Sequence, residues 1–197
     1  MVTLKKSKTK LTQASIDESI DESFPASDPP AWTTVSRQHK KSSTANTLQD
    51  KVTLEWQRTS ANFDYETYNR DAKLTFAGGA RIQVSNSPVY FGEAKHANSE
   101  ELMIAALSCC YMQTFLAVAS KQGYNVKSYK DEAFGVLGND EKGKMSMTEV
   151  SLNPIIKFEG IQPNDAVLVK IREKAHANCF IANSVNSIIH ITIKLIK

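Results

Sequence analysis

The sequence lacks several features that would assign it quickly to a class of protein. It contains only three cysteines in 197 residues, Cys109, Cys110 and Cys179. Such an odd, low number is not the disulfide framework of a small secreted domain. Its 24 basic and 21 acidic residues nearly balance, giving a formal net charge of +3, and no basic stripe with interleaved aromatic residues occurs. This balance argues against nucleic acid as an obligatory partner.

A secretory signal is also lacking, because no apolar run follows the lysines near the start of the chain. We therefore expect a cytoplasmic protein. One uncharged segment, residues 102–119, approaches the minimum length of a membrane span. It contains the polar residues Ser108, Gln113 and Thr114, and no second hydrophobic span accompanies it. A buried core helix is the favoured interpretation, without membrane association.

Residues 1 to about 48 differ in composition from the rest. They hold a tandem Ile-Asp-Glu-Ser at 16–19 and 20–23, followed by a proline-rich stretch at 24–32. Such a segment buries too little apolar surface to offset the entropy of ordering the chain. We predict a disordered arm over residues 1–48 and one folded domain over residues 49–197.

Hydrophobic periodicity within the folded part predicts strands, then a helix, then strands, a second helix and a final strand. Asn98 and Glu101 have the spacing of a capping box, and Gly123 supplies a stop, which predicts a helix from Ser99 to Gln122. This helix is apolar almost all round and must be enclosed by protein. The second helix is expected to open at Pro163 or Asp165.

The predicted strands alternate apolar and polar residues. Pro154, inside one of them, indicates an edge position or a bulge, and the overall order is that of an α+β fold. The expected strands are residues 52–58, 73–76, 81–84, 126–136, 148–158 and 189–195.

The cysteines have a common and a less common interpretation. Most free cysteines are small buried hydrophobes, and on composition alone that interpretation is favoured over catalysis. A zinc site from Cys109, Cys110, His176 and Cys179 is less favoured, because adjacent residues of a helix point about 100° apart and make poor joint ligands.

Two segments carry a family resemblance. Residues 98–102 are Asn-Ser-Glu-Glu-Leu, residues 105–110 are Ala-Ala-Leu-Ser-Cys-Cys, and residues 175–184 contain the third cysteine. They resemble the two cysteine segments of the OsmC/Ohr family, the osmotically inducible protein C-like and organic hydroperoxide resistance proteins. The resemblance extends over about residues 62–193. It implies an OsmC-like fold, with antiparallel sheets around a long central helix and a second helix, in an intertwined homodimer.

The resemblance also implies roles for four residues. Cys110 would be the peroxidatic thiol and Cys179 the resolving thiol, while Glu100 would pair with an arginine. For that arginine we favour Arg70, with Arg58 and Arg81 as rivals. The sequence departs from the family at Ser99, where proline is usual, and at Ala72 and Tyr111, where this branch often has histidine. Cys109 is an additional thiol without a role.

Physical chemistry supports a cation at this site but raises a problem of distance. The attacking sulfur must be a thiolate, and a guanidinium, which is always charged, can stabilise it. A carboxylate would in turn pair with the buried arginine. However, ten residues of helix separate Glu100 from Cys110 by about 15 Å. Either the helix begins later than expected, or Arg70 and Glu100 serve Cys110 of a second subunit, which is the alternative that we predict.

The expected function is a thiol-dependent peroxidase. The apolar neighbours of the cysteines favour an organic hydroperoxide, and a disulfide between Cys110 and Cys179 would be reduced by an external dithiol, for which the family suggests a lipoylated protein. No metal or organic cofactor is expected. The alternative is a non-catalytic stress protein that binds a small hydrophobic ligand in the same apolar cleft.

Overall fold

The computed structural model describes residues 49–196, so the predicted arm (residues 1–48) lies outside the described part of the chain. The order of elements confirms the predicted α+β fold. The two helices are α2 (Ser99–Lys121) and α3 (Asp165–Ala177). The strands are β1 (Val52–Trp56), β2 (Ala72–Phe76), β3 (Arg81–Val84), β4 (Asn125–Asp131), β5 (Phe134–Asn139), β6 (Met145–Leu152), β7 (Pro154–Glu159), β8 (Ile188–Ile191) and β9 (Lys194–Ile196).

Helix α2 begins where the sequence predicted. The Asn98 side chain accepts a hydrogen bond from the Glu101 backbone amide at 2.8 Å, and the Glu101 carboxylate accepts one from the Asn98 amide at 3.0 Å. The helix ends one residue before the predicted Gln122, and Gly123 follows with a φ of 78°. The capping box and the glycine therefore fix the length of this helix locally.

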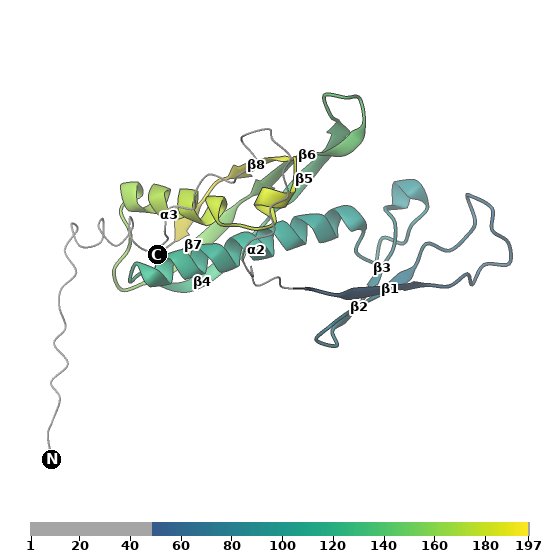
Figure 1. Cartoon of the computed structure of the whole chain (residues 1–197), viewed down its shortest axis with the longest axis horizontal. Helices are drawn as coiled ribbons and strands as arrows, with labels where there is room; N and C mark the ends of the chain where they lie inside the picture. The colour runs from purple at the N-terminus through teal and green to yellow at the C-terminus, as the bar shows by residue number, and fades with distance from the viewer. Residues whose placement is uncertain (1–48, 197) are drawn as a thin grey trace, which may run out of the picture.

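The core lies between α2, α3 and the strands that follow α2. Leu107, Tyr111 and Phe115 follow one another at intervals of one helical turn and are fully buried. Helix α3 packs against α2 through the same core, and Figure 1 shows the two helices side by side. The opposite face of α2 is only partly covered by the residues that the structure describes.

The long strands predicted at 126–136, 148–158 and 189–195 are each divided in two, so this prediction was wrong in detail. The two halves of each predicted strand lie in different three-stranded sheets, whose orders are β4-β7-β9 and β5-β6-β8. Asp131 stands at one break, where its Oδ1 accepts a hydrogen bond from the Asn153 amide at the next break, at 2.7 Å. This contact between distant residues is invisible to local periodicity.

Pro154 was predicted to occupy an edge strand or a bulge, and neither is correct. It is the first residue of β7, which is the central strand of its sheet. A proline is tolerated at the first position of a strand, because the missing amide interrupts no ladder bond further along.

Strands β1, β2 and β3 form a separate antiparallel sheet, which we call the N-terminal sheet. A hairpin joins β2 and β3, and Gly79 adopts a φ of 88° in its turn. Figure 1 shows the N-terminal sheet extending away from the two helices, beyond the start of α2. Every residue of β1 is exposed. This sheet therefore buries little of its surface within one chain.

Candidate active site at two thiols and an arginine

The structure brings together two of the four predicted site residues. The thiol of Cys110, midway along α2, lies close to the thiol of Cys179, which follows α3, near enough for the two to affect each other's ionisation. Cys179 is fully buried and Cys110 half-buried, whereas Cys109 is exposed. The exposure of Cys109 follows from helix geometry, because neighbouring side chains diverge by about 100°. The two thiols that meet are those that the family resemblance singled out.

Cys179 is held by the turn that ends α3. The helix stops at Ala177, two residues before Cys179, and the Cys179 amide donates to the His176 carbonyl at 3.1 Å. The Ala182 amide donates to Cys179 Sγ at 3.5 Å, and the Cys179 carbonyl accepts from Asn183. The sulfur is therefore positioned by backbone groups on both sides, independently of any flexible side chain.

The protonation state of Cys179 follows from its surroundings. Burial raises the pKa of its thiol to about 11, and the hydrogen bond with Cys110 acts in the same direction. The amides of Ala182 and Ile181 oppose this only partly. Cys179 is therefore protonated at neutral pH, and its S–H can donate to the sulfur of Cys110.

No group of three or more His, Cys, Asp or Glu side chains in residues 49–196 is arranged to hold a metal ion. The zinc site considered as an alternative from the sequence thus has no set of ligands within that range.

Arg70 lies in a clamp of aromatic rings and carbonyls. Its Nη1 donates to the Tyr68 carbonyl at 2.5 Å, its Nη2 donates to the Tyr65 carbonyl, and its Cζ lies 3.8 Å from the centre of the Tyr68 ring. The Phe91 ring is 5.2 Å away. These distances are those of cation–π contacts. The clamp fixes the guanidinium in one place before any ligand arrives.

Asn69 anchors the loop that carries Arg70. Its side chain donates to the Gln57 carbonyl at 2.9 Å and accepts from the Thr59 amide at 2.8 Å, while its carbonyl accepts from the Trp56 indole at 2.7 Å. The loop is thereby attached to the end of β1. The position of Arg70 is consequently set by the N-terminal sheet.

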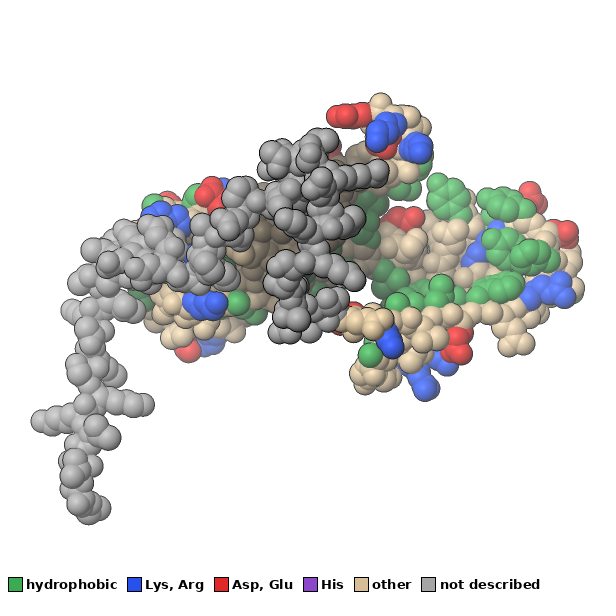
Figure 2. Space-filling view, viewed as in Figure 1, with side chains coloured by type: hydrophobic (Ala, Val, Ile, Leu, Met, Phe, Trp, Pro, Cys, Tyr) green, Lys and Arg blue, Asp and Glu red, His purple; other side chains and the backbone are tan. Residues whose placement is uncertain are grey.

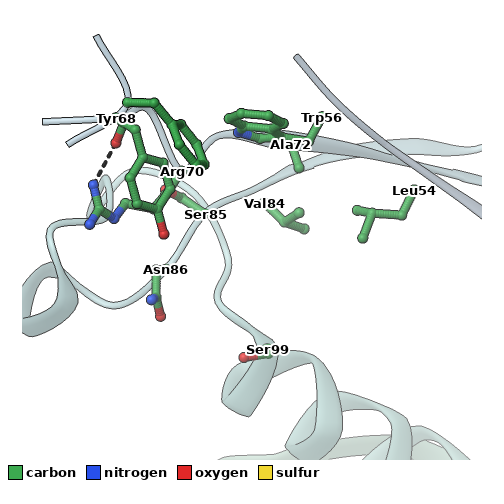
Figure 3. Close-up of a pocket in the computed structure, with 10 residues that line it drawn as sticks. Leu54, Trp56, Tyr68, Arg70, Ala72, Val84, Ser85, Asn86 and Ser99 are labelled. Atoms are coloured by element: carbon green, nitrogen blue, oxygen red, sulfur yellow. Dashed lines mark hydrogen bonds between the residues drawn. The ribbon is translucent and has the colours of Figure 1, made fainter. Parts of the chain in front are cut away.

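Arg70 lines a cleft of about 450 Å³ between the N-terminal sheet and the start of α2. Figure 3 shows the apolar side chains of Leu54, Trp56 and Val84 on the sheet, with Ser99 on the first turn of the helix. One wall of the cleft is apolar and aromatic, and Arg70 is the cation among its lining residues. It is shaped for a small ligand with an apolar body and a polar end.

Within one chain, Arg70 and Glu100 do not reach Cys110. Helix α2 is continuous from Ser99 through Cys110, so about 15 Å of helix separate Glu100 from the thiol. Glu100 accepts a hydrogen bond from the Ser99 hydroxyl at 3.1 Å, and the ion pairs of the described residues include none between Glu100 and Arg70. The later helix start considered from the sequence is therefore wrong.

The rival arginines offer no better candidate. Arg58 and Arg81 are both exposed, Arg58 just beyond β1 and Arg81 at the start of β3. Sequence reasoning missed a third, Arg172 on α3, whose charge acts on the buried hydroxyl of Tyr111. The position of Arg172 directly after the buried Ile171 was the available signal.

The uncovered face of α2 is unusual for a core helix. By length and composition α2 could cross a membrane, yet only 28% of its most apolar window is buried within the described residues. Figure 2 also shows apolar side chains gathered over the N-terminal sheet. Among these are Val52 (56% exposed), Leu54 (63%) and Trp56 (44%). Exposed apolar surfaces of this size are typical of sites at which a protein binds a partner.

Comparisons with known proteins find similar sequences and similar folds. Residues 92–194 match the family model described as OsmC-like protein. The chain is similar to the structure of an OsmC-like protein of unknown function from Vibrio cholerae, with 39% identity, a TM-score of 0.71 and coverage of 75% of this chain and 99% of that one. It is also similar in fold to an organic hydroperoxide resistance protein from Elizabethkingia anophelis, at 21% identity and a TM-score of 0.56, over 77% of this chain and 98% of that one. The uncharacterized protein YmaD of Bacillus subtilis is 24% identical over 120 residues, which are 59% of this chain and 79% of that protein.

Proposed function

This chain belongs to the OsmC-like protein family, and from that premise we propose that it is a thiol-dependent peroxidase that reduces organic hydroperoxides. The observation that carries the proposal is the closeness of the thiols of Cys110 and Cys179, which come from different helical segments. Both are free thiols, one buried and one half-buried, and a disulfide between them requires such closeness. The organic hydroperoxide resistance protein among the structural neighbours has the same fold.

The roles of the two sulfurs follow from their surroundings. The Cys110 thiolate attacks the distal oxygen of the hydroperoxide, so that an S–O bond forms, the O–O bond breaks and the alkoxide leaves to take up a proton. Cys179, whose pKa is raised to about 11, stays protonated in this step and does not compete for the peroxide. Cys110 is therefore the peroxidatic thiol and Cys179 the resolving thiol.

The second step closes the cycle on the protein. The Cys179 sulfur attacks the sulfenic sulfur of Cys110, an S–S bond forms and the S–O bond breaks, and the oxygen leaves as water. An external dithiol then reduces the disulfide, and a lipoylated protein is the reductant that we propose. Since the cycle needs reduced thiols, we also propose a cytoplasmic location.

Arg70 and Glu100 act in this proposal across a subunit interface. The exposed apolar faces of α2 and of the N-terminal sheet are suited to cover one another in a homodimer. The clamp on Arg70 would then present its guanidinium to Cys110 of the partner subunit, with Glu100 as its counter-charge. A guanidinium beside the thiolate stabilises it and assists the departure of the alkoxide.

Stopped-flow mixing with cumene hydroperoxide tests the proposal. We expect the wild-type protein to lose two thiols per chain, Cys110→Ser to lose none at the site, and Cys179→Ser to stop at a sulfenic acid. Cys109→Ser is the matched control, because it removes the adjacent exposed thiol and is expected to leave the reaction unchanged.

The apolar cleft beside Arg70 favours a second candidate function, the binding of a small hydrophobic ligand without catalysis. In that case neither Cys110→Ser nor Cys179→Ser would alter the consumption of peroxide. Unchanged peroxide consumption in both variants would therefore reject the peroxidase proposal and favour a ligand-binding protein.

A further inference from the structure

The cleft beside Arg70 is lined by ten residues, and Arg70 is the charged residue among them. The ion pairs of the described residues include none with Arg70, although its side chain is half-buried. A partly buried positive charge without a carboxylate beside it is unfavourable. The charge of the cleft therefore favours a ligand with a negative group.

The aromatic clamp leaves part of the guanidinium available. A guanidinium has five N–H groups, and the bonds to the Tyr68 and Tyr65 carbonyls use one on Nη1 and one on Nη2. The remaining N–H groups, on Nε, Nη1 and Nη2, donate to no other described residue. A fixed planar fork with free N–H groups has the geometry that binds the two oxygens of a carboxylate.

Ser85 brings a second donor to the same cleft. The residue is 8% exposed, and its Oγ accepts a hydrogen bond from the Glu93 amide at 3.0 Å. A hydroxyl that accepts a bond still has a proton to donate, and this proton has no acceptor among the described residues. Because a buried donor without a partner is unfavourable, Ser85 is suited to donate to a ligand oxygen in the cleft.

Asn86 brings a third donor, and its loop holds it in place. Its Oδ1 accepts a hydrogen bond from the Ser87 amide at 2.9 Å, which leaves Nδ2 as the end of the side chain without a partner among the described residues. A Cβ on Gly92 would lie 1.7 Å from the Asn86 carbonyl oxygen, and the Gly92 amide donates to the Ser87 carbonyl at 3.1 Å. The loop is therefore closed on itself and fixes its donors before a ligand arrives.

The donors and the apolar side chains lie toward different ends of the cleft. Figure 3 shows Arg70 and Asn86 on one side, and Val84 and Leu54 on the other. A carboxylate only accepts hydrogen bonds and can use every donor, whereas the N–H groups of a neutral amide would find no carboxylate among the lining residues to accept them. The cleft should therefore distinguish these two groups on an otherwise identical ligand.

We propose that this cleft binds a small amphiphilic carboxylate. The carboxylate oxygens accept hydrogen bonds from Arg70, Ser85 and Asn86, and the apolar body lies against the apolar wall of the cleft. One consequence rests on the proposed function, in which Arg70 serves the thiolate. A bound carboxylate occupies that guanidinium, so it excludes the hydroperoxide and inhibits the reaction competitively.

Calorimetric titration of the full-length protein tests the site without peroxide. The probes are 4-phenylbutyrate and its neutral isostere 4-phenylbutanamide, and the readout is the ratio of their dissociation constants. The wild type is expected to bind the carboxylate about 100-fold more tightly than the amide. Arg70→Gln is expected to bring the ratio near one, and Ser85→Ala to lower it about tenfold.

The ratio is insensitive to a general loosening of the fold, which would weaken both probes alike. Ser87→Ala is the matched control, because Ser87 lies in the same loop but does not line the cleft, and its side chain makes no capping bond. It is expected to keep the wild-type ratio. A wild type that does not prefer the carboxylate, or a preference that survives both Arg70→Gln and Ser85→Ala, would overturn the inference.

A second experiment connects the site to the proposed reaction. With cumene hydroperoxide as substrate, 4-phenylbutyrate is expected to raise KM at unchanged kcat, whereas the amide has little effect. A lowered kcat at unchanged KM would place the carboxylate elsewhere and reject the inference. Cys110→Ser is expected to keep the preference for the carboxylate. If that preference is present but the wild type consumes no hydroperoxide, the proposed function fails and the carboxylate site stands.

Discussion

The region around the thiols and the N-terminal sheet are built in opposite ways. Tyr111, Phe115 and Cys179 are fully buried among α2, α3 and the following strands, whereas Leu54 of the N-terminal sheet is 63% exposed. The thiol region is complete within one chain, while the sheet that holds Arg70 leaves its apolar residues uncovered. Under the proposed function, folding of one chain would bring the two thiols together, and association of two chains would supply the cation.

The largest expected difference between the two regions is in stability. Phe115→Ala removes a fully buried ring and is expected to lower the free energy of unfolding by about 3–5 kcal/mol. Leu54→Ala removes an exposed side chain and is expected to change it by less than about 1 kcal/mol in dilute, dissociated protein. Urea denaturation at low protein concentration measures both. Equal decreases in the free energy of unfolding for both variants would contradict the difference in burial between the two regions.

The next largest effect concerns the arginine. Arg70→Ala is expected to slow peroxide reduction by a factor on the order of 100 to 1,000, because the thiolate and the leaving alkoxide lose their cation. Arg70→Lys, which keeps the charge but not the planar fork, is expected to recover part of the rate. Single-turnover kinetics with cumene hydroperoxide is the measurement.

Mixing two inactive variants tests whether the site is shared. Arg70→Ala and Cys110→Ser chains, allowed to exchange, would form heterodimers in which one site has both native residues. Random exchange then restores about one quarter of the wild-type activity. If the mixture stays as inactive as its components, Arg70 acts within its own chain or not at all.

The folded protein is expected to lose stability at alkaline pH because of the thiol of Cys179. The pKa of Cys179 is raised from 9.0 to about 11 in the folded state. The unfolded chain therefore loses this proton at a lower pH than the folded chain does. The contribution of the Cys179 thiol to the free energy of unfolding is complete below pH 9 and is lost between pH 9 and 11. The loss amounts to at most about 3 kcal/mol.

Urea midpoints between pH 8 and 11 check this for the reduced protein. The urea midpoint of Cys179→Ala is expected to fall less steeply with rising pH than that of the wild type. The tyrosines with raised pKa values affect both proteins alike, so the difference reports Cys179 alone. Parallel declines would show that Cys179 does not contribute.

The smallest effect is expected at the junction of the two regions. Asn98→Ala removes the side chain that accepts a hydrogen bond from the Glu101 amide. The substitution is expected to lower the free energy of unfolding by about 1 kcal/mol. Asn164→Ala removes the corresponding cap of α3, which accepts the Val167 amide at 2.9 Å, and serves as a comparison away from the junction. Thermal unfolding of both variants measures the two caps, and a shift confined to Asn164→Ala would mean that the Asn98 box is dispensable.

What the sequence predicted well depends on local signals. The limits of α2 follow from Asn98, Glu101 and Gly123, all within a turn of the ends that they define. The resemblance to the family implied that Cys110 and Cys179 act together, and the structure places their side chains close to each other.

What the sequence did not predict depends on contacts between distant residues. The breaks in the long strands reflect the bond between Asp131 and Asn153. The clamp on Arg70 depends on Phe91, in another loop, and on the attachment of Asn69 to β1. Neither the spacing of apolar residues nor any short motif records such contacts.

One carboxylate has a consequence for protein engineering. Asp131 joins the break in the sheets, through Asn153, to Ser108 of α2, one turn before the first fully buried aromatic ring of that helix. This carboxylate therefore ties the middle of α2 to the break between the sheets. Under the proposed function, directed evolution toward bulkier peroxides should leave Asp131 untouched and randomise the exposed cleft residues of β1.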